Sequence, residues 1–158
     1  MVRLANNVHI EDLIEPMQPK AVTFAAAAEK AGIPVIFTCT GRPFLQQTAL
    51  FAQGRYELAF VNALRKQCGL YLLTPAENKS IVTWTLNSKH IIGVTRLKSE
   101  AFDTAIWDGK QATWNLKIDI NKNKKIDYLE LAKIGDSLGL NAGGLWKTPD
   151  YPHFQYRP

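Results

Sequence analysis

The pattern of hydrophobic and polar positions predicts helices around a short strand in the first half of the chain. A helix is expected at residues 18–32, where proline lies in the first turn, apolar side chains share one face and Gly32 ends the run. Residues 35–40 are β-branched and aromatic, which predicts a buried strand. Residues 43–53 and 56–68 are predicted as two further helices.

The second half has the pattern of a small antiparallel sheet followed by one helix and a final strand. Strands are predicted at residues 81–85, 101–107, 112–118 and 153–156, with Asp108-Gly109 as a hairpin turn and residues 70–73 as a short strand or buried turn. Residues 127–138 are amphipathic and predict a helix that ends at Gly139. The fold class is therefore predicted as α+β, with helices packed on one face of the sheet and a cleft on the other.

Length and composition are consistent with one domain. The chain has 158 residues, of which 46% are hydrophobic, enough for a substantial core. No low-complexity linker divides it, so we expect a single domain spanning residues 1–158, without a second, separate binding domain.

The start of the chain and its two cysteines bear on the compartment. Residues 1–7 contain no apolar core of signal-peptide length, and no segment has the length needed for stable membrane insertion. We therefore expect the protein to stay in the cytoplasm in which it is made. Cys39 and Cys68 are expected there as reduced, buried thiols. Neither has a neighbouring His or Asn in the sequence that would favour a nucleophilic role.

The charge balance favours an anionic partner. Nineteen Lys and Arg against fourteen Asp and Glu give a net charge of +5, and the pI is about 9.2. Nucleic acid would suit that balance, but no recognition motif or aromatic-basic pattern supports it. The charge alone therefore suits an anionic polymer in general, and we expect the chain to act as a monomer.

The chemistry is concentrated near the C-terminus. Asp150 precedes His153 by three residues, with a proline between them, so a metal-binding nitrogen and a proton-accepting oxygen can be aimed at one water. His90 is followed, after a loop, by Asp103 inside an apolar run. A carboxylate within a strand is costly unless it is paired or bound to a metal. His90, Asp103 and His153 would form a three-ligand zinc site with a fourth position open for water.

The chain resembles the phage endolysins that are L-alanyl-D-glutamate endopeptidases, relatives of the zinc D-alanyl-D-alanine carboxypeptidases and vancomycin-resistance dipeptidases. The similar residues extend from Leu13 to Gln155. They include Thr-Gly-Arg-Pro-Phe at 40–44, Ser-Lys-His at 88–90, Ala-Phe-Asp at 101–103, Gly-Gly-Leu-Trp at 143–146 and Asp-Tyr-Pro-His-Phe-Gln at 150–155.

The resemblance implies a zinc peptidase with the fold of the D-alanyl-D-alanine carboxypeptidases and Hedgehog proteins. It implies one Zn²⁺ held by His90, Asp103 and His153, with Asp150 as general base. It also implies that Arg42 faces the zinc and stabilises the developing oxyanion, whereas the sequence alone would favour a solvated loop arginine. The implied reaction cleaves the L-alanyl-D-glutamate bond of the peptidoglycan stem peptide. The implied role is host-cell lysis after holin-type release from the cytoplasm.

Two stretches depart from the family pattern. Twelve residues lie between His90 and Asp103, where the family usually has six, so residues 91–100 must bulge out as a loop. Residues 56–80 are longer than in many family members and are expected to alter the substrate groove. Gln47, Ser88 and Trp146 are further candidates for contacting substrate, although the pattern slightly favours the Trp146 indole as a cap on the core.

Residues 119–130 have the spacing of an EF-hand calcium loop. The oxygen-bearing side chains stand at loop positions one, three, five, nine and twelve: Asp119, Asn121, Asn123, Asp127 and Glu130. Lys124 replaces the glycine of position six, three lysines add positive charge, and a strand rather than a helix is predicted before the loop. These departures favour a polar connection in which Asp127 caps the next helix, with Ca²⁺ binding as the alternative.

Two rival functions remain open from the sequence. A D,D- or L,D-carboxypeptidase would use the same zinc chemistry, so the site residues do not separate it from an endopeptidase. A non-catalytic wall-binding or virion structural protein could retain the same fold.

Overall fold

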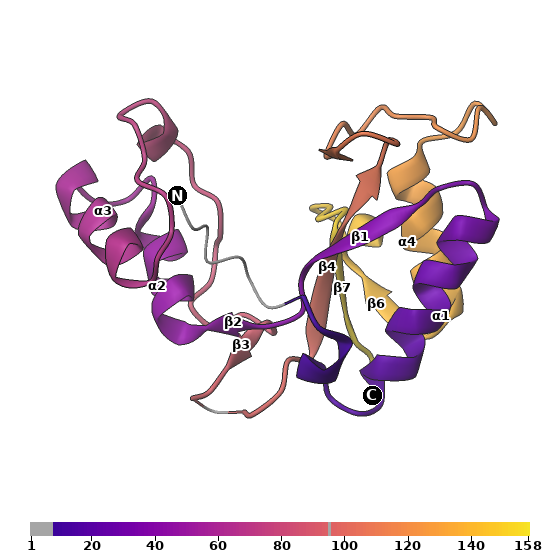
Figure 1. The fold of residues 1–158 in the computed structure, drawn as a ribbon, viewed down its shortest axis with the longest axis horizontal. Coiled ribbons are helices and arrows are strands. Elements are labelled where there is room, and N and C mark those ends of the chain that lie inside the picture. Colours follow the sequence, from indigo (N-terminus) through magenta and orange to yellow (C-terminus); the bar gives the residue numbers. More distant parts are fainter. Residues whose placement is uncertain (1–7, 95) are drawn as a thin grey trace.

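An antiparallel sheet forms the centre of the structure, a computed structural model that describes residues 8–94 and 96–158 (Figure 1). Its strand order is β1 (Val35–Cys39), β4 (Ala101–Trp107), β7 (His153–Tyr156) and β6 (Leu140–Ala142), and β5 (Ala112–Thr113) also pairs with β4. Every pair in this sheet is antiparallel. Two stretches discussed above lie outside the described residues: residues 1–7, for which no signal peptide was predicted, and residue 95 of the predicted loop.

Helices α1 (Met17–Lys30) and α4 (Asp127–Ser137) cover one face of the sheet (Figure 1). Phe24 of α1 packs on Phe154 of β7 with ring centroids 4.4 Å apart, and Phe102 of β4 lies 5.3 Å from the Phe154 ring. All three side chains are fully buried. The fold is therefore α+β with helices on one face, as the pattern predicted.

The end of α1 shows why the chain turns sharply into the sheet. Gly32 has a φ of +77°, in the left-handed region that glycine adopts without strain. The Ile33 N–H donates to the Ala28 carbonyl and the Gly32 N–H donates to the Glu29 carbonyl, at 2.9 Å each. This is the Schellman arrangement, and it places Val35 at the start of β1 two residues later.

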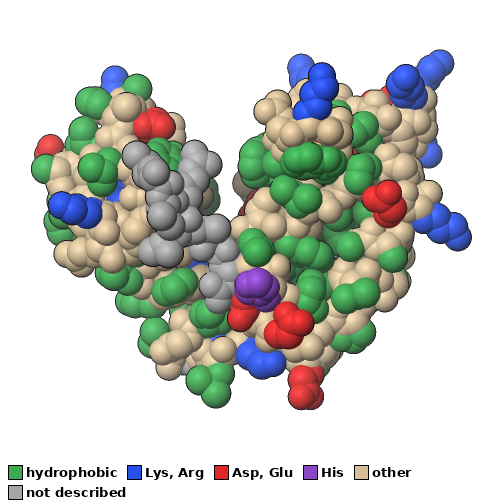
Figure 2. All heavy atoms as spheres, in the orientation of Figure 1, with side chains coloured by type: hydrophobic (Ala, Val, Ile, Leu, Met, Phe, Trp, Pro, Cys, Tyr) green, Lys and Arg blue, Asp and Glu red, His purple; other side chains and the backbone are tan. Residues whose placement is uncertain are grey.

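A second region lies beside the open face of the sheet. The short strands β2 (Arg42–Pro43) and β3 (Ile91–Ile92) pair in parallel, and α2 (Phe44–Ala52), α3 (Leu58–Gln67) and the 3-10 helix η2 (Glu77–Lys79) follow β2. We call residues 44–80 the helical lobe, and residues 8–39 with 101–158 the sheet lobe. In Figure 1 the two lobes stand apart and are joined through β2 and β3. Figure 2 shows the hollow between them.

Several predicted elements are wrong, and each error has a physical cause. Residues 81–85 form no strand, since no neighbouring strand pairs with them. Only Ala112–Thr113 of the predicted strand 112–118 pairs with β4. The strand β1 is half-exposed rather than buried, because it lies at the edge of the sheet. The strand β6 was not predicted at all. Residues 70–73 are neither a strand nor a buried turn but an irregular connection: Tyr71 and Leu72 are exposed, and only Leu73 lies in the small core of the helical lobe.

The cysteines and the helices bear on the predicted compartment. Both cysteines are free; Cys39 is buried, whereas Cys68 is half-buried. No helix among the described residues is long and apolar enough to cross a membrane.

Candidate metal centre

A row of three residues crosses the sheet at the candidate site. Asp103 of β4 is directly opposite Cys39 of β1 and directly opposite His153 of β7. Residues paired in this way on antiparallel strands point to the same face. Phe102 and Phe154, their neighbours in sequence, point to the other face and pack against Phe24 of α1. The row is therefore anchored by the main hydrophobic core.

His90 reaches this row from a turn outside the sheet. It lies just before β3, where its carbonyl accepts a hydrogen bond of 2.8 Å from the Arg42 N–H, and its own N–H donates to Ser88 Oγ at 3.2 Å. The loop that follows is closed at its base, because the Glu100 N–H donates to the Lys89 carbonyl at 3.0 Å. The additional residues thus leave the two side chains together, although Ile91–Ile92 of the predicted loop form the strand β3 instead.

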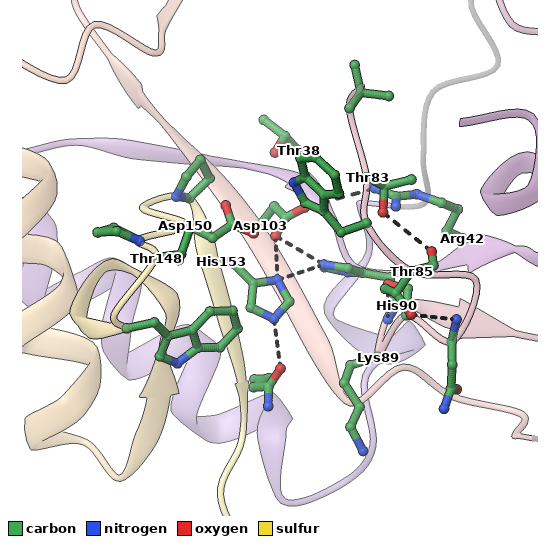
Figure 3. Close-up of a pocket in the computed structure, with 18 of the residues that line it drawn as sticks. Thr38, Arg42, Thr83, Thr85, Lys89, His90, Asp103, Thr148, Asp150 and His153 are labelled. Atoms are coloured by element: carbon green, nitrogen blue, oxygen red, sulfur yellow. Dashed lines mark hydrogen bonds and ion pairs between the residues drawn. The ribbon is translucent and has the colours of Figure 1, made fainter. Parts of the chain in front are cut away.

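Three donor atoms converge at this point, as Figure 3 shows for the labelled side chains. His90 Nε2 lies 3.0 Å from Asp103 Oδ1 and 3.1 Å from His153 Nδ1, and the latter two atoms are 3.0 Å apart. A tetrahedral zinc ion with bonds of about 2.0–2.1 Å brings its ligand atoms roughly 3.3–3.4 Å from one another. Two imidazole nitrogens and a carboxylate oxygen at this spacing fit such an ion.

The surroundings shift the pKa values of the two histidines in opposite directions. Burial lowers the pKa of His90, which keeps its imidazole neutral. Burial alone would lower the pKa of His153, but hydrogen bonding to Asp103 outweighs it and raises that pKa. Burial opposes ionisation of Asp103, yet the two histidines hold the pKa of its carboxyl group well below the usual range. The negative charge of Asp103 between the two imidazoles favours a positively charged group at this point.

Gln155 orients His153 from two residues further along β7. Its Oε1 lies 3.0 Å from His153 Nε2, so Nε2–H donates to the amide oxygen and Nδ1 faces Asp103. Holding the other ring nitrogen in this way is how proteins fix the orientation of a metal-binding histidine. Gln155 belongs to the motif quoted above, but the sequence analysis gave it no role. The available signal was that residues two apart on a strand, such as His153 and Gln155, point to the same face.

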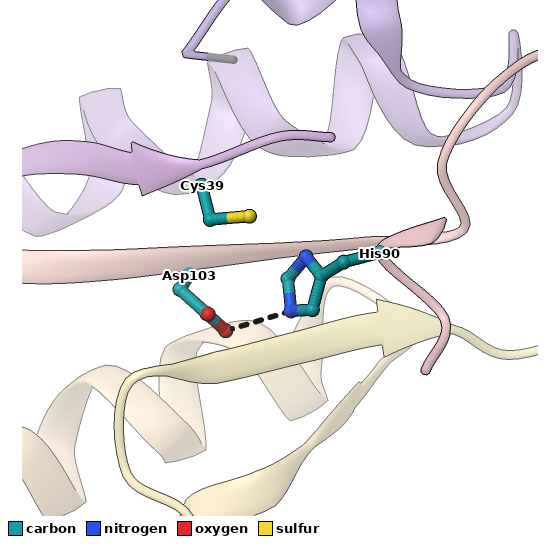
Figure 4. Close-up of side chains that lie close together, drawn as sticks. All are labelled: Cys39, His90 and Asp103. Atoms are coloured by element: carbon teal, nitrogen blue, oxygen red, sulfur yellow. Dashed lines mark hydrogen bonds and ion pairs between the residues drawn. The ribbon is translucent and has the colours of Figure 1, made fainter. Parts of the chain in front are cut away.

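Cys39 lies beside the centre (Figure 4), in a position that the sequence did not indicate. Its Sγ, one nitrogen of His90 and one carboxylate oxygen of Asp103 all lie within 4.8 Å of one another. Burial raises the pKa of the Cys39 thiol to about 12, so the thiol stays protonated at neutral pH. The protonated thiol is a weaker metal ligand than the two histidines, and it is a poor nucleophile.

Arg42 faces the centre from β2 and is held there by Gln47. Arg42 Nη1 donates to Gln47 Oε1 at 2.7 Å, and Nη2 lies 4.0 Å from Asp103 Oδ2. Gln47 is fully buried and donates in turn to Thr83 Oγ1 and the Thr85 carbonyl. The expected substrate contact of Gln47 is corrected by this burial: its amide positions Arg42. The alternative of Arg42 as a solvated loop residue is also wrong, because its side chain is only 12% exposed.

Asp150 lies in the wall of the pocket beside His153. Its N–H donates to the Gly143 carbonyl at 2.9 Å, and its carbonyl accepts from the His153 N–H at 3.1 Å. A Cβ at Gly143 would collide with the Asp150 carbonyl, so only glycine permits this approach. Asp150 is exposed as a residue, but desolvation of its carboxyl group in the pocket raises the pKa.

The donor atoms open into a pocket of about 690 Å³. Its walls include Ser88, one of the predicted substrate contacts, and three tryptophans: Trp84, Trp114 and Trp146. The ring of Trp146 lies 5.3 Å from that of His153, and its Nε1–H donates to Asn141 Oδ1. The preference for a core position of this indole is therefore wrong, and its alternative place in the groove is correct. Trp84 and Trp114 are pocket residues that the sequence did not single out.

No family model matches the chain. It is 32% identical over 152 residues to the peptidoglycan L-alanyl-D-glutamate endopeptidase CwlK of Bacillus subtilis (strain 168), and the alignment covers 93% of this chain and 75% of that protein.

This chain belongs to the L-alanyl-D-glutamate endopeptidase family. The same fold is found in the crystal structure of the L-Ala D-Glu endopeptidase ChiX of Serratia marcescens, with a TM-score of 0.50 and 18% sequence identity. That similarity covers 99% of this chain and 90% of the other. The family resemblance drawn from the motifs is thus confirmed.

Proposed function

We propose that this protein is a zinc peptidase that hydrolyses the L-alanyl-D-glutamate bond of the peptidoglycan stem peptide. The observation that carries the proposal is the triangle of donor atoms from His90, Asp103 and His153, at 3.0–3.1 Å, in the pocket of a member of this family. These three residues would hold one zinc ion. When bound, zinc supplies a Lewis acid that lowers the pKa of a water molecule and polarises an amide carbonyl.

Asp150 is the proposed general base. Its carboxylate lies in the pocket wall, where the fields of His153 and Asp103 both act on it. It would take the proton from the attacking water and then donate it to the leaving amine. Glu100 is a poor substitute, because it pairs with Lys89 at 2.7 Å and does not line the pocket.

Arg42 is the proposed stabiliser of negative charge. Its guanidinium faces the same pocket and is held by the buried amide of Gln47. A permanently charged, preorganised fork can hold the carbonyl oxygen that gains charge as the amide is attacked. Ser88 lines the pocket, and its Oγ accepts a hydrogen bond from the His90 N–H. Its main proposed role is therefore to position His90, and a direct contact with substrate is secondary.

The wider function extends this proposal. The net charge of +5 suits the anionic polymers of the cell wall, and we treat residues 1–158 as one peptidase domain that acts as a monomer. The resemblance to phage endolysins supports a role in host-cell lysis, with the protein kept in the host cytoplasm until holin-type release.

The test uses purified cell wall and the zinc-loaded protein. Cleavage of the proposed bond should release new amino termini on D-glutamate, which amine labelling and mass spectrometry of the digest would identify. Free D-alanine would instead indicate a carboxypeptidase. Zinc binding with no released product from any wall type would indicate a wall-binding protein without catalysis.

Metal analysis with a matched pair of histidine variants gives the second part of the test. The wild type should contain about one zinc per chain, and His153→Ala should lose both zinc and activity, because two remaining protein ligands bind zinc weakly. His9→Ala is the control: His9 is exposed and does not line the pocket, so this variant should keep both. Full zinc occupancy in His153→Ala would contradict the proposed centre.

A further inference from the structure

A second group of oxygen atoms lies in the loop of residues 119–130, between the strand β5 and the helix α4. Lys122 and Lys124, at loop positions four and six, have φ angles of +59° and +67°. Lys124 thus adopts the left-handed conformation for which an EF-hand loop ordinarily uses glycine. The missing glycine, which counted against calcium in the sequence, does not prevent the turn.

Side-chain oxygens of the first half of the loop bind its own backbone. Asp119 accepts hydrogen bonds from the N–H groups of Asn123 and Lys124 at 3.0 and 2.9 Å. Asn121 Oδ1 accepts from the Asn123 N–H at 3.2 Å, and Asn123 Oδ1 accepts from the Lys125 N–H at 2.9 Å. The chain is therefore wrapped around these side chains.

Two buried oxygen atoms of the second half have no partner among the described residues. Asp127 is fully buried, and its Oδ2 accepts from the Ile120 N–H at 2.6 Å, across the loop; its Oδ1 is unpaired. Glu130 Oε1 accepts from Asn123 Nδ2 at 2.7 Å, while Oε2 is buried and unpaired. The predicted cap is wrong, because Asp127 makes no side-chain cap bond to α4. An unpaired carboxylate oxygen is costly to bury, so two in one loop require a partner.

The electrostatics of the loop indicate that this partner is a cation. Asp119, Asp127 and Glu130 place three carboxylates within these twelve residues, and the two unpaired buried oxygens belong to two of them. Lys122, Lys124 and Lys125 are exposed, and no ion pair found in the described part of the chain joins one of them to these carboxylates. Three carboxylates thus repel one another without a compensating positive group in contact.

We propose that this loop binds one Ca²⁺ ion. The available ligands are carboxylate, amide and backbone carbonyl oxygens, the hard donors that calcium prefers, with no imidazole or thiol that would favour zinc. The spacing of the five side chains is the one by which a twelve-residue loop supplies six to eight oxygens to calcium. This site is separate from the zinc centre, which uses residues of the opposite face of the sheet.

The position of the loop gives the ion a structural role. Asn121 Nδ2 donates to the Ala31 carbonyl at 3.0 Å, at the end of α1, and Asp127 is the first residue of α4. The Asp127 N–H also donates to the Ile118 carbonyl, on the segment that leads from the pocket residue Trp114. Calcium in the loop would therefore stabilise the junction of α1, α4 and the segment behind one pocket wall.

The charges of the loop set the expected affinity. Three carboxylates are offset by three lysines within the twelve residues. EF-hand affinity decreases as the ligand charge falls, and the weak end of the range lies at about 10⁻⁴–10⁻³ M. We therefore expect a dissociation constant in that range.

The experiment is a calcium titration of the full chain, with its zinc centre loaded, in calcium-free buffer. Calorimetry should give one equivalent of calcium. At about ten times the dissociation constant, the melting temperature should rise by roughly 3–6 °C, with a smaller rise in Mg²⁺ at the same concentration. No response to calcium, or an equal response to Mg²⁺, would overturn the proposal.

Glu130→Gln is the decisive variant. Glutamine retains an oxygen for the hydrogen bond from Asn123 but removes one repelling charge, so the calcium-free melting temperature should stay the same or rise. The calcium response should disappear, as it should in Asp119→Asn. Glu29→Gln removes an equal charge from the exposed side of α1 and should keep the full response. A preserved response in Glu130→Gln, or a lower calcium-free melting temperature there, would indicate a structural carboxylate rather than a calcium ligand.

Discussion

The sheet lobe and the helical lobe differ in how their side chains are packed. The sheet lobe has a continuous core in which Phe24, Phe102 and Phe154 contact one another and both helices contribute buried residues. The buried cluster of the helical lobe consists of Ala52, Val61 and Leu73. The proposed zinc ligands Asp103 and His153 belong to the first lobe, whereas Gln47, which holds Arg42, belongs to the second.

This difference separates two tasks of the active site. Ligands need fixed positions, and strands anchored by a large core provide them. The helical lobe has less apolar burial, so we expect it to open locally at a lower free-energy cost than the sheet lobe. Arg42, which Gln47 of the helical lobe holds, can then adapt to substrate while Asp103 and His153 stay in place. The predictions below test this division.

The largest expected effect is on the base, which belongs to the sheet lobe. Asp150→Asn keeps the volume but cannot accept a proton, so turnover should fall by roughly 10²- to 10⁴-fold while zinc content and melting temperature stay near wild type. Kinetics on purified wall and metal analysis check this. Glu100→Gln is the control, because Glu100 does not line the pocket and should be dispensable. Loss of zinc together with activity would make Asp150 a support of the ligands instead.

Arg42 tests the junction between the lobes. Arg42→Ala should reduce turnover by about 10²- to 10³-fold, as loss of an oxyanion stabiliser does, with little change in zinc content. Arg42→Lys keeps the charge but loses the fork that Gln47 holds, so it should recover only part of the rate. Unchanged turnover in Arg42→Ala would show that the helical lobe contributes nothing to catalysis through this residue.

Gly143→Ala should disturb the sheet-lobe side of the pocket. The new Cβ collides with the Asp150 carbonyl and crowds His153, and a misplacement of about 1 Å in a catalytic group can cost roughly 100-fold. Zinc affinity should fall along with turnover, as a metal titration would show. Gly109→Ala is the control, since nothing lies within 4 Å of its added Cβ and only backbone strain, about 1 kcal/mol, is expected. Equal behaviour of the two variants would disprove the close approach.

The smallest effect on activity is expected from Arg65, which supports the helical lobe. It is buried, and its Nε donates to the Tyr71 carbonyl at 2.7 Å while Nη1 donates to Gln53 Oε1 at 3.2 Å. Arg65→Met should lower the local opening free energy by about 1–3 kcal/mol. Hydrogen exchange in α2 and α3 should therefore accelerate by roughly 10- to 100-fold, while β4 keeps its protection. Lys66→Met, at the exposed neighbouring position, should change neither. Equal acceleration in β4 would mean that the lobes unfold as one unit.

The sequence predicted the helices better than the strands. The three longest helices begin and end within a few residues of the predicted bounds, because glycine and proline signals and apolar periodicity act locally. The β-branched run at 81–85 had the composition of a strand, but strand formation needs a partner that no local signal specifies. The short strand β6 was missed for the same reason: its pairing with β7 is a long-range choice.

What the sequence by itself determined is the chemistry: two histidines and two carboxylates in family motifs, an arginine after the first strand, and the oxygen spacing of a calcium loop. Only the tertiary structure decided how these groups are held. It placed Cys39 beside Asp103, gave Gln155 the second nitrogen of His153, buried Gln47 behind Arg42 and turned Lys124 into a conformation usual for glycine. The physical reason is that residue type sets what a side chain can bind, whereas strand register and packing between distant segments set which partner it meets.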